Sequence, residues 1–294
     1  MSDHQPKFSR STSFVIVFLA YVVCIVIGIY VAQLFGYNNP LIDVAIADVA
    51  ATVVIFLFSL TLKNSSMYDP YWSVIPIPIA YYWMSINPDG NVIRQWMILF
   101  LVCFWGIRLT ANWVRGWPGL HHEDWRYVDL AKKNGKLYWL VSFSGIHLLP
   151  TAWVYGGMLP VWAAMQNEAP LGIIDYLAFI ITFGAVVIEW ISDEQLKAYK
   201  NSNPPKGSFI KSGLWAYSRH PNYFGEVSFW VGLFVFALAM PTDYYWTGIG
   251  ALALIILFVF ISIPMMDERH KASREGYAEH MKKVSGLIPW FPKG

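Results

Sequence analysis

A charge-free apolar run from Phe14 to Ala32 constrains the fold of this chain more than any other feature. A helix over this run is long enough to cross the hydrocarbon core of a bilayer. The run is too long for a signal-peptide core and has no evident cleavage site, so we expect a retained span. The chain is 56% hydrophobic and only 14% charged, against about 25% charged in soluble domains. These features predict an integral, multi-pass helical membrane protein.

Apolar runs and helix breakers predict an all-α transmembrane helical bundle of seven or eight spans. Pro76 and Pro78 fall in the third candidate span, which we expect to be kinked or partly re-entrant. Pro150 and Pro160 predict a tilt or break in the fifth. The candidate spans are Phe14–Gln33, Val44–Leu62, Tyr71–Ile86, Trp96–Val114, Leu137–Met165, Leu171–Ile191, Asn222–Met240 and Tyr244–Pro264.

The distribution of Lys and Arg predicts the orientation of the spans. With eight spans and a cytoplasmic N-terminus, 20 of the 21 basic residues, Lys7 among them, fall on the cytoplasmic side. Arg94 alone falls on the far side. Because basic residues concentrate in cytoplasmic loops, we expect both termini in the cytoplasm. The short loops and compact termini favour a bacterial inner membrane over the endoplasmic reticulum.

Several kinds of site are not indicated by the sequence. Cys24 and Cys103 lie in apolar runs and are typical of small core residues rather than of a disulfide or zinc site. The basic residues lie at helix ends, so no nucleic-acid partner is expected. The seven histidines form no metal-like array, and His147 is interpreted as a hydrogen-bonded core residue. Rossmann, Walker, GxSxG and HExxH motifs are absent.

Polar residues gather between Gly213 and Glu226, where an apolar segment is about to begin. Such residues are costly at membrane depth and therefore indicate a functional site. The alternative is an interfacial anchor made by Arg219, His220 and Tyr223. An anchor explains neither Asn222 nor Glu226.

A second candidate is Asp69, which precedes the third span beside Pro70. It could cap the following helix. Alternatively, a poorly hydrated aromatic pocket would raise its pKa, so that it donates a proton or hydrogen bond to a substrate carbonyl. Both interpretations remain open from the sequence.

Two further segments combine charge with helical spacing. Arg108 and Arg115 lie on one helical face and suit phosphate oxygens, although positive-inside anchoring is the simpler interpretation. Glu189, Asp193 and Lys197 form one polar stripe, for which a salt-bridge ladder is the alternative. Such a ladder fits Glu189 poorly, because this residue follows an apolar run.

The last segment runs from Asp267 to His270, at the end of a span and before a short amphipathic helix. Simple helix-surface ion pairs are again the alternative. We expect these segments to converge on one cytoplasmic mouth. A funnel of acids, arginines and aromatics suits a soluble anionic cofactor that meets a lipophilic substrate.

The run from Gly213 to Glu226, followed by Asp267-Glu-Arg, Tyr277 and Leu287-Ile-Pro, resembles the C-terminal domain of the steroid 5-alpha-reductase superfamily. The resemblance is specific over 171–291 and weaker at 122–127 and 69–72. The Arg-His-Pro-Asn-Tyr core is also similar to that of sterol reductases. Isoprenylcysteine and phospholipid methyltransferases share a related Arg-His-Pro-x-Tyr.

This resemblance implies a seven-span bundle whose C-terminal half encloses NADPH from the cytoplasmic side. It implies a substrate-end division at 1–136 and a cofactor division at 137–294, with Asn222 holding the nicotinamide amide. The cofactor-binding residues expected from the resemblance and the charge pattern are Arg115, Arg126, Glu189, Asp193, Lys197, Tyr217, Arg219, His220, Asn222, Tyr223, Glu226, Asp267, Arg269 and His270.

The substrate end departs from the family pattern, because the Gln-Glu pair that engages the steroid 3-oxo group is absent. Asp69, helped by Tyr68, is the nearest candidate catalytic group. Trp105 stands where the family has a catalytic tyrosine, and we expect it to contact substrate together with Trp72.

The resulting hypothesis is an NADPH-dependent oxidoreductase that reduces a C=C bond of a lipophilic, enone-like substrate in the bilayer. Hydride would reach the β-carbon while Asp69 polarises the carbonyl. One alternative is a membrane methyltransferase that uses S-adenosylmethionine. Another is a non-catalytic, lipid-binding relative. No metal is expected in any of the three.

Overall fold

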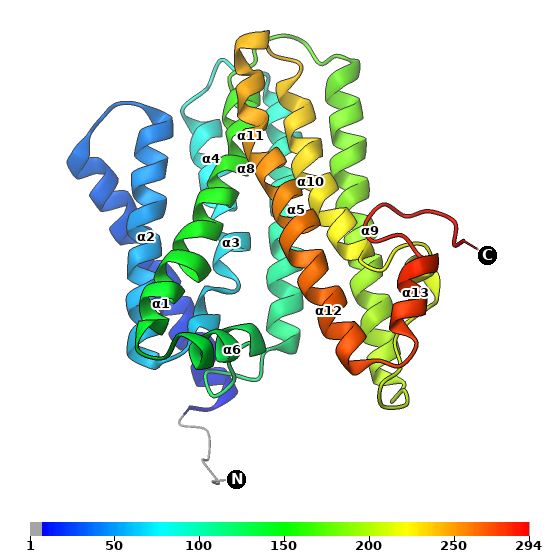
Figure 1. Ribbon diagram of the computed structural model, residues 1–294. Coiled ribbons are helices and arrows are strands. Elements are labelled where there is room, and N and C mark those ends of the chain that lie inside the picture. The colour runs from blue at the N-terminus through cyan, green and yellow to red at the C-terminus, as the bar shows by residue number, and fades with distance from the viewer. Residues whose placement is uncertain (1–7, 294) are drawn as a thin grey trace. The chain divides into compact units, whose positions relative to one another are not determined.

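The computed structural model describes residues 8–293 and is built from helices, coloured along the chain in Figure 1. Lys7, one of the predicted cytoplasmic basic residues, lies outside the described part. No β-strand occurs among the described residues; one isolated bridge joins Ser218 and Ser285. The predicted all-α class is therefore confirmed.

The chain forms two compact units. Unit 1 comprises Met1–Asn87 and Val102–Tyr155, and unit 2 comprises Pro88–Leu101 and Gly156–Gly294. The boundaries of these two units do not coincide with the predicted division into 1–136 and 137–294. That functional division stays a prediction.

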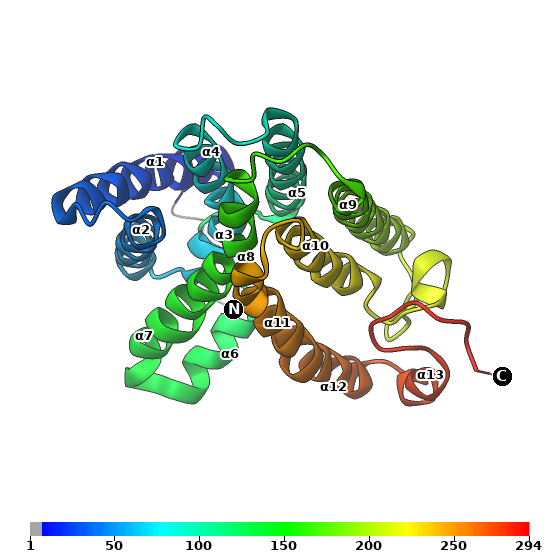
Figure 2. The same ribbon diagram turned by 90° about the horizontal axis from the view of Figure 1, so that it is seen from above.

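Unit 1 begins with a pair of long antiparallel helices, α1 (Arg10–Phe35) and α2 (Pro40–Leu62), which lie side by side in Figure 2. Gly28 permits their close approach, because a Cβ there would lie 2.5 Å from the Ala47 carbonyl oxygen. α1 ends at Gly36, whose φ of 54° is in the left-handed region that glycine tolerates.

The third predicted span is interrupted beside Pro76 as expected, whereas the fifth stays helical throughout and holds Pro160 inside α8. The third becomes α3 (Tyr71–Val74) and α4 (Pro76–Ser85), with the break at Ile75. The fifth begins as α7 (Tyr138–Val141), widens into a π-helix over Ser142–Leu148, and continues as α8 (Leu149–Met165). Unit 1 also holds the 3₁₀ helix Ser65–Tyr68, the second part of α5 (Val92–Gly116), and α6 (Trp125–Asn134).

Unit 2 is organised around α9 (Ile173–Asn201) and α10 (Pro221–Ala237), which pack closely together. A Cβ on Gly225 of α10 would lie 2.7 Å from the Ala185 carbonyl oxygen of α9. The unit continues through α11 (Ile249–Leu257), the π-helix Phe258–Ser262, α12 (Ile263–Ser273) and α13 (Tyr277–Lys283).

Arg94, the one basic residue predicted on the far side, is a structural residue of unit 2. Its Nε lies 2.6 Å from Asp175 Oδ1, and both side chains are 1% exposed. Its Nη1 donates to the Asn167 carbonyl oxygen at 2.7 Å. The buried charge is thus neutralised and hydrogen-bonded, as burial of an arginine requires.

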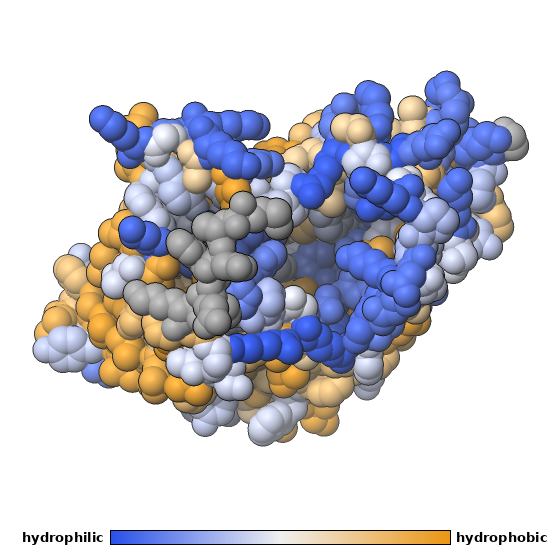
Figure 3. All heavy atoms as spheres, turned by 90° about the horizontal axis from the view of Figure 1, so that it is seen from below, coloured by the Kyte–Doolittle hydropathy of each residue, from blue (hydrophilic) through white to orange (hydrophobic). Residues whose placement is uncertain are grey.

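Six helices among the described residues are long and apolar enough to cross a membrane: Arg10–Phe35, Pro40–Leu62, Val92–Gly116, Trp125–Met165, Ile173–Asn201 and Thr242–Ser273. Two further predicted spans are helical but short. One is interrupted at Ile75, and the other, α10, has 17 residues. The multi-pass membrane character is confirmed, whereas the count of seven or eight and the orientation stay predictions. Figure 3 shows hydrophilic side chains gathered on one face and hydrophobic ones toward its rim.

Candidate functional sites in the two units

The segment that precedes α10 in unit 2 is fixed by local backbone and side-chain contacts. Gly213 opens a 3₁₀ helix (Gly213–Ala216) with a φ of 63°, which is unfavourable for residues with a Cβ. Gln195 Oε1 accepts a hydrogen bond from the Leu214 amide at 2.9 Å, and Trp215 Nε1 donates to the Ser192 carbonyl oxygen at 3.0 Å. α9 therefore sets where the next residues lie.

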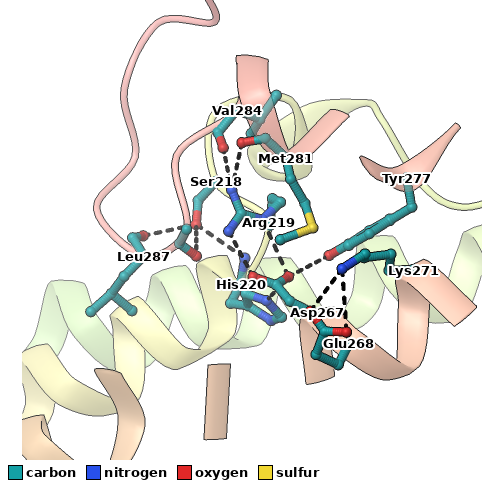
Figure 4. Close-up of polar contacts among 11 residues, drawn as sticks. Ser218, Arg219, His220, Asp267, Glu268, Lys271, Tyr277, Met281, Val284 and Leu287 are labelled. Carbon is teal, nitrogen blue, oxygen red and sulfur yellow. Dashed lines mark hydrogen bonds and ion pairs between the residues drawn. The ribbon is translucent and has the colours of Figure 1, made fainter. Parts of the chain in front are cut away.

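Arg219 and His220 both contact Asp267 of α12 (Figure 4). Arg219 Nη2 lies 2.6 Å from Asp267 Oδ2 and its Nε lies 3.2 Å from Oδ1. His220 Nε2 lies 2.9 Å from the same Oδ1, which also accepts from the Tyr277 hydroxyl at 2.8 Å. Asp267 is 4% exposed, so these contacts replace the water that an ionised carboxylate loses on burial.

The remaining Arg219 donors hold the C-terminal segment. Nη1 donates to the carbonyl oxygens of Met281 at 3.2 Å and Val284 at 2.5 Å. Ser218 Oγ donates to the Leu287 carbonyl oxygen at 2.8 Å. Because Nε, Nη1 and Nη2 all donate within the protein, Arg219 holds α12 and the C-terminal segment together, and its predicted contact to the cofactor stays a prediction.

A pocket of about 230 Å³ lies beside this cluster within unit 2. His220, Asn222, Tyr223, Arg269 and His270, all predicted from the sequence, line it together with Arg219. Its lining also includes Lys200, Phe209, Trp215, Arg274, Tyr277 and His280.

The pocket offers two cations that the sequence analysis did not select. The side chains of Lys200 and Arg274 make no hydrogen bond or ion pair with a described residue. The Asn222 amide also donates no hydrogen bond to a described residue. His270 Nδ1 is shielded from solvent and has no hydrogen-bond partner there. These groups can contact a bound anion.

Other predicted cofactor residues of unit 2 lie outside that pocket lining. Glu189 is 4% exposed at the α9–α10 contact, and Glu226 accepts from Trp230 Nε1 at 2.8 Å. Asp193 lies between Glu189 and Lys197 on α9. Lys197 makes no ion pair with a described residue, so the alternative of a salt-bridge ladder along this stripe does not extend to Lys197. The exposed Tyr217 ring contacts Phe291 of the C-terminal segment.

In unit 1, Asp69 does not cap the helix that follows it. α3 has Pro70 at its N-cap and no side-chain cap, whereas Asp69 Oδ1 accepts from the Tyr127 hydroxyl at 2.7 Å. Burial raises the pKa of Asp69 to about 7, although the Tyr127 hydrogen bond and the nearby Arg126 oppose this shift. The capping alternative is wrong, and the expected rise in pKa is present.

Tyr68 does not share a hydrogen bond with Asp69. Its hydroxyl lies 2.8 Å from Thr151 Oγ1, which in turn lies 2.8 Å from Thr52 Oγ1. The predicted catalytic pair is therefore divided between two hydrogen-bond groups. The His147 ring packs at a tilt against Tyr68, and its ring nitrogens lie 3.0 Å from the Ser142 carbonyl oxygen and 3.0 Å from Ser59 Oγ. The interpretation of His147 as a hydrogen-bonded core residue is confirmed.

Asp48 and Tyr71 form a buried pair that sequence reasoning missed. The Tyr71 hydroxyl donates to Asp48 Oδ1 at 2.9 Å, and Thr52 Oγ1 donates to that hydroxyl at 3.4 Å. Asp48 is 5% exposed and Tyr71 is 1% exposed. Asp48 is a lone acid inside the apolar run Val44–Leu62, which is the signal that could have revealed it.

Asp48 borders an apolar pocket of about 560 Å³ within unit 1. The pocket lies among α1, α2 and the α3–α4 segment, and its size suits a small lipophilic molecule. Its walls include Ile25, Gly28, Ile29, Ala32, Val44, Ala47, Ala51, Ile75, Pro78 and Ile79.

The other predicted residues of unit 1 have separate local contacts. Trp72 and Trp105 do meet, with ring centroids 5.8 Å apart and Trp105 fully buried. Arg126 forms an ion pair with Asp124 at 2.7 Å on the surface. Arg115 lies exposed in the last turn of α5. No group of metal-ligating side chains occurs among residues 8–293.

Comparisons with known proteins place the chain in a family without giving it an activity. An uncharacterized protein of Schizosaccharomyces pombe is 28% identical over 250 residues, which cover 76% of this chain and 73% of that relative. No solved structure matches. Residues 55–284 match the family described as protein of unknown function DUF1295. Since that match covers more than half of its length, the chain belongs to the DUF1295 family.

Proposed function

We propose that this protein is a membrane-embedded, NADPH-dependent reductase of a C=C bond conjugated to a carbonyl in a lipophilic substrate. The observation that carries the proposal is the Asp48–Tyr71 pair beside the apolar pocket of unit 1. An acid buried among membrane helices is costly and indicates function. The resemblance of 171–291 to the steroid 5-alpha-reductase superfamily supports the same reaction class.

Asp48 would act in its acid form as the group that polarises the carbonyl. Tyr71 donates to Oδ1, so the proton of the acid belongs on Oδ2, which makes no hydrogen bond to a described residue. An Oδ2–H group can donate to a substrate carbonyl as enolate charge develops. The largely apolar walls lower the local polarity around Asp48 and would strengthen that hydrogen bond. This proposal moves the catalytic role from Asp69 and Tyr68 to Asp48 and Tyr71.

The pocket of unit 2 has the chemistry to hold part of the cofactor. Bound NADPH would supply the hydride. Arg274 and Lys200 suit phosphate oxygens, while Trp215, Phe209 and Tyr277 offer aromatic surface to a base. Because about 230 Å³ is too small for a whole dinucleotide, we assign this pocket to one phosphate-bearing end.

The phosphate role accordingly passes from Arg219 and Arg126 to Arg274 and Lys200. Arg219 donates to Asp267 and to two backbone carbonyls, and Arg126 is paired with Asp124. An arginine already held by an internal carboxylate must break that pair before it can bind a phosphate. Asn222, whose side-chain amide lines the same pocket, would then contact this phosphate-bearing end rather than the nicotinamide amide that the resemblance implies.

Ligand titration tests this proposal. Purified protein is titrated with NADPH, NADH and S-adenosylmethionine, followed by nicotinamide fluorescence and thermal stability. We expect saturable binding of NADPH and weaker binding of NADH, which lacks the 2′-phosphate. Saturable binding of the methyl donor without NADPH binding would instead establish the methyltransferase alternative. Binding of none of the three would favour a non-catalytic lipid-binding protein.

Two substitutions refine this titration. Asn222→Ala and Arg274→Gln should each weaken NADPH binding about tenfold, as expected when a polar or charged contact is lost. Lys271→Gln is the matched control, because Lys271 is exposed and paired with Glu268 on the surface. An equal loss in the control would mean that only general charge attraction had been measured.

A further inference from the structure

The apolar pocket of unit 1 has a second acidic residue in its lining, five positions before Asp48. Asp43 lies in the first turn of α2, near the loop that joins α1 to α2. At about 1.5 Å per residue, it is roughly 7 Å from Asp48 along the helix axis. The pocket therefore has one acid in its interior and one toward the end of the α1–α2 pair.

The Asp43 side chain keeps unused acceptor capacity. Its Oδ1 is shielded from solvent and has no hydrogen-bond partner among the described residues. The free amides at the start of α2 do not use it, because Asn39 Oδ1 accepts from the Leu41 and Ile42 amides. A shielded carboxylate oxygen with no donor is costly and thus indicates a missing donor.

The charge of the pocket lining is entirely acidic. Asp43 and Asp48 are the ionisable carboxyl groups, and the lining contains no Lys, Arg or His. Gln33, Asn38 and Tyr82 add uncharged polar groups. With Asp48 in its acid form, an anionic ligand would face the Asp43 carboxylate without a cation, whereas a cationic or neutral donor would find an acceptor there.

We propose that this pocket binds an amphiphile whose polar end donates hydrogen bonds to Asp43 and whose apolar body fills the space among α1, α2 and α4. A primary amine is bound more tightly than the matching alcohol, and the matching carboxylate is excluded. This inference rests on the proposed function and deepens it by naming the polar end of the substrate. The reducible carbonyl group would lie at Asp48, about 7 Å deeper along the helix axis.

Three ligands of equal chain length test the inference without cofactor or turnover. Dodecylamine, dodecanol and dodecanoate are titrated calorimetrically into the full chain in phosphatidylcholine nanodiscs, with empty nanodiscs subtracted. We expect the amine to bind about tenfold more tightly than the alcohol, since a charged donor strengthens the hydrogen bond. The carboxylate should show no saturable binding.

Substitutions assign this preference to Asp43. Asp43→Asn should lower amine affinity about tenfold and leave alcohol affinity within about twofold. Asp243→Asn, at an exposed acid in the 3₁₀ helix Thr242–Gly248, is the matched control and should change neither. If Asp43→Asn fails to fold, Ala32→Phe tests the cavity itself, because a ring at this lining position should abolish amine binding.

Two results would overturn the inference: carboxylate binding as tight as amine binding, or unchanged amine affinity in Asp43→Asn with an unchanged melting temperature. The NADPH titration is separate from these measurements. Amine selectivity without NADPH binding would retain the pocket and reject the reductase. NADPH binding without amine selectivity would retain the reductase and reject this substrate class.

Discussion

The charged cluster of unit 2 and the Asp48–Tyr71 pair of unit 1 are both buried, but they use their polar atoms differently. In unit 2, one carboxylate accepts from Arg219, His220 and Tyr277. In unit 1, Asp48 accepts from Tyr71 and borders an apolar pocket. The first cluster is largely satisfied by the protein itself, whereas the second retains capacity for a ligand.

The difference shows that the most conspicuous sequence motif need not supply the residues that contact the ligand. The Arg-His-Pro-Asn-Tyr run is conspicuous because several polar residues stand together in the sequence. Its arginine and histidine fix α12 and the C-terminal segment, while Asn222 remains available. Asp48 is inconspicuous because its partner, Tyr71, is 23 residues away on another helix.

The largest expected effect on stability is the loss of the Asp267 carboxylate. Asp267→Asn removes the charge that neutralises Arg219, and leaving a buried charge unpaired costs about 3 kcal/mol or more. We expect a large fall in the free energy of unfolding, measured by denaturation in detergent micelles. Lys271→Ala, which breaks an exposed pair with Glu268, is the control and should change it by less than about 0.5 kcal/mol. Equal losses of unfolding free energy in Asp267→Asn and Lys271→Ala would contradict the stabilising role of the buried Asp267 carboxylate.

A smaller loss of stability is expected from the hydroxyl groups that surround the unit 1 pair. Thr151→Val keeps the shape of the side chain but removes the group that contacts Thr52 and the Tyr68 hydroxyl. Leaving buried hydroxyls with fewer partners should cost about 1–3 kcal/mol. Thermal unfolding measures this, and Thr61→Val, on the exposed part of α2, is the matched control. A stabilising effect of Thr151→Val would contradict the hydrogen bonds of Thr151 with Thr52 and Tyr68.

The smallest expected effect is a pH dependence carried by Asp69. Its pKa is about 7 in the folded protein, against about 4 in an unfolded chain. The folded state therefore binds more protons between these values, and stability should fall as pH rises from about 4 to about 7. Asp69→Asn keeps an acceptor for Tyr127 and should flatten this dependence, which these pKa values set at about 2 kcal/mol between pH 5 and pH 7, with less than about 0.5 kcal/mol remaining at pH 7. Melting temperatures at pH 5 and pH 7 test it; parallel profiles would contradict the raised pKa.

Much of the fold could be predicted from the sequence because apolar length and proline act locally. The third span is interrupted at Ile75, beside Pro76, as expected, whereas the π-helix of the fifth segment was not predicted. The span count could not be predicted in the same way. α10 is only 17 residues long, so hydropathy does not decide whether it crosses the bilayer alone.

The candidate sites were predictable where functional side chains are neighbours in sequence. His220, Asn222 and Tyr223 do line one pocket. Arg274 could not be distinguished from surface arginines in the sequence. Whether its guanidinium is left without an internal carboxylate partner depends on tertiary contacts that the sequence does not show. Likewise, Tyr68 and Asp69 are adjacent in sequence, but their polar atoms belong to different hydrogen-bond groups.

We propose that Asp48 acts on the substrate while unit 2 holds the cofactor. The most direct measurement compares NADPH affinity with the rate of enone-dependent NADPH oxidation in Asp48→Asn, with Asp243→Asn as control. We predict a fall in rate of about 100-fold or more, as for the loss of a general acid, and NADPH affinity within about twofold. An unchanged rate, or an equal loss of NADPH affinity, would contradict the claim.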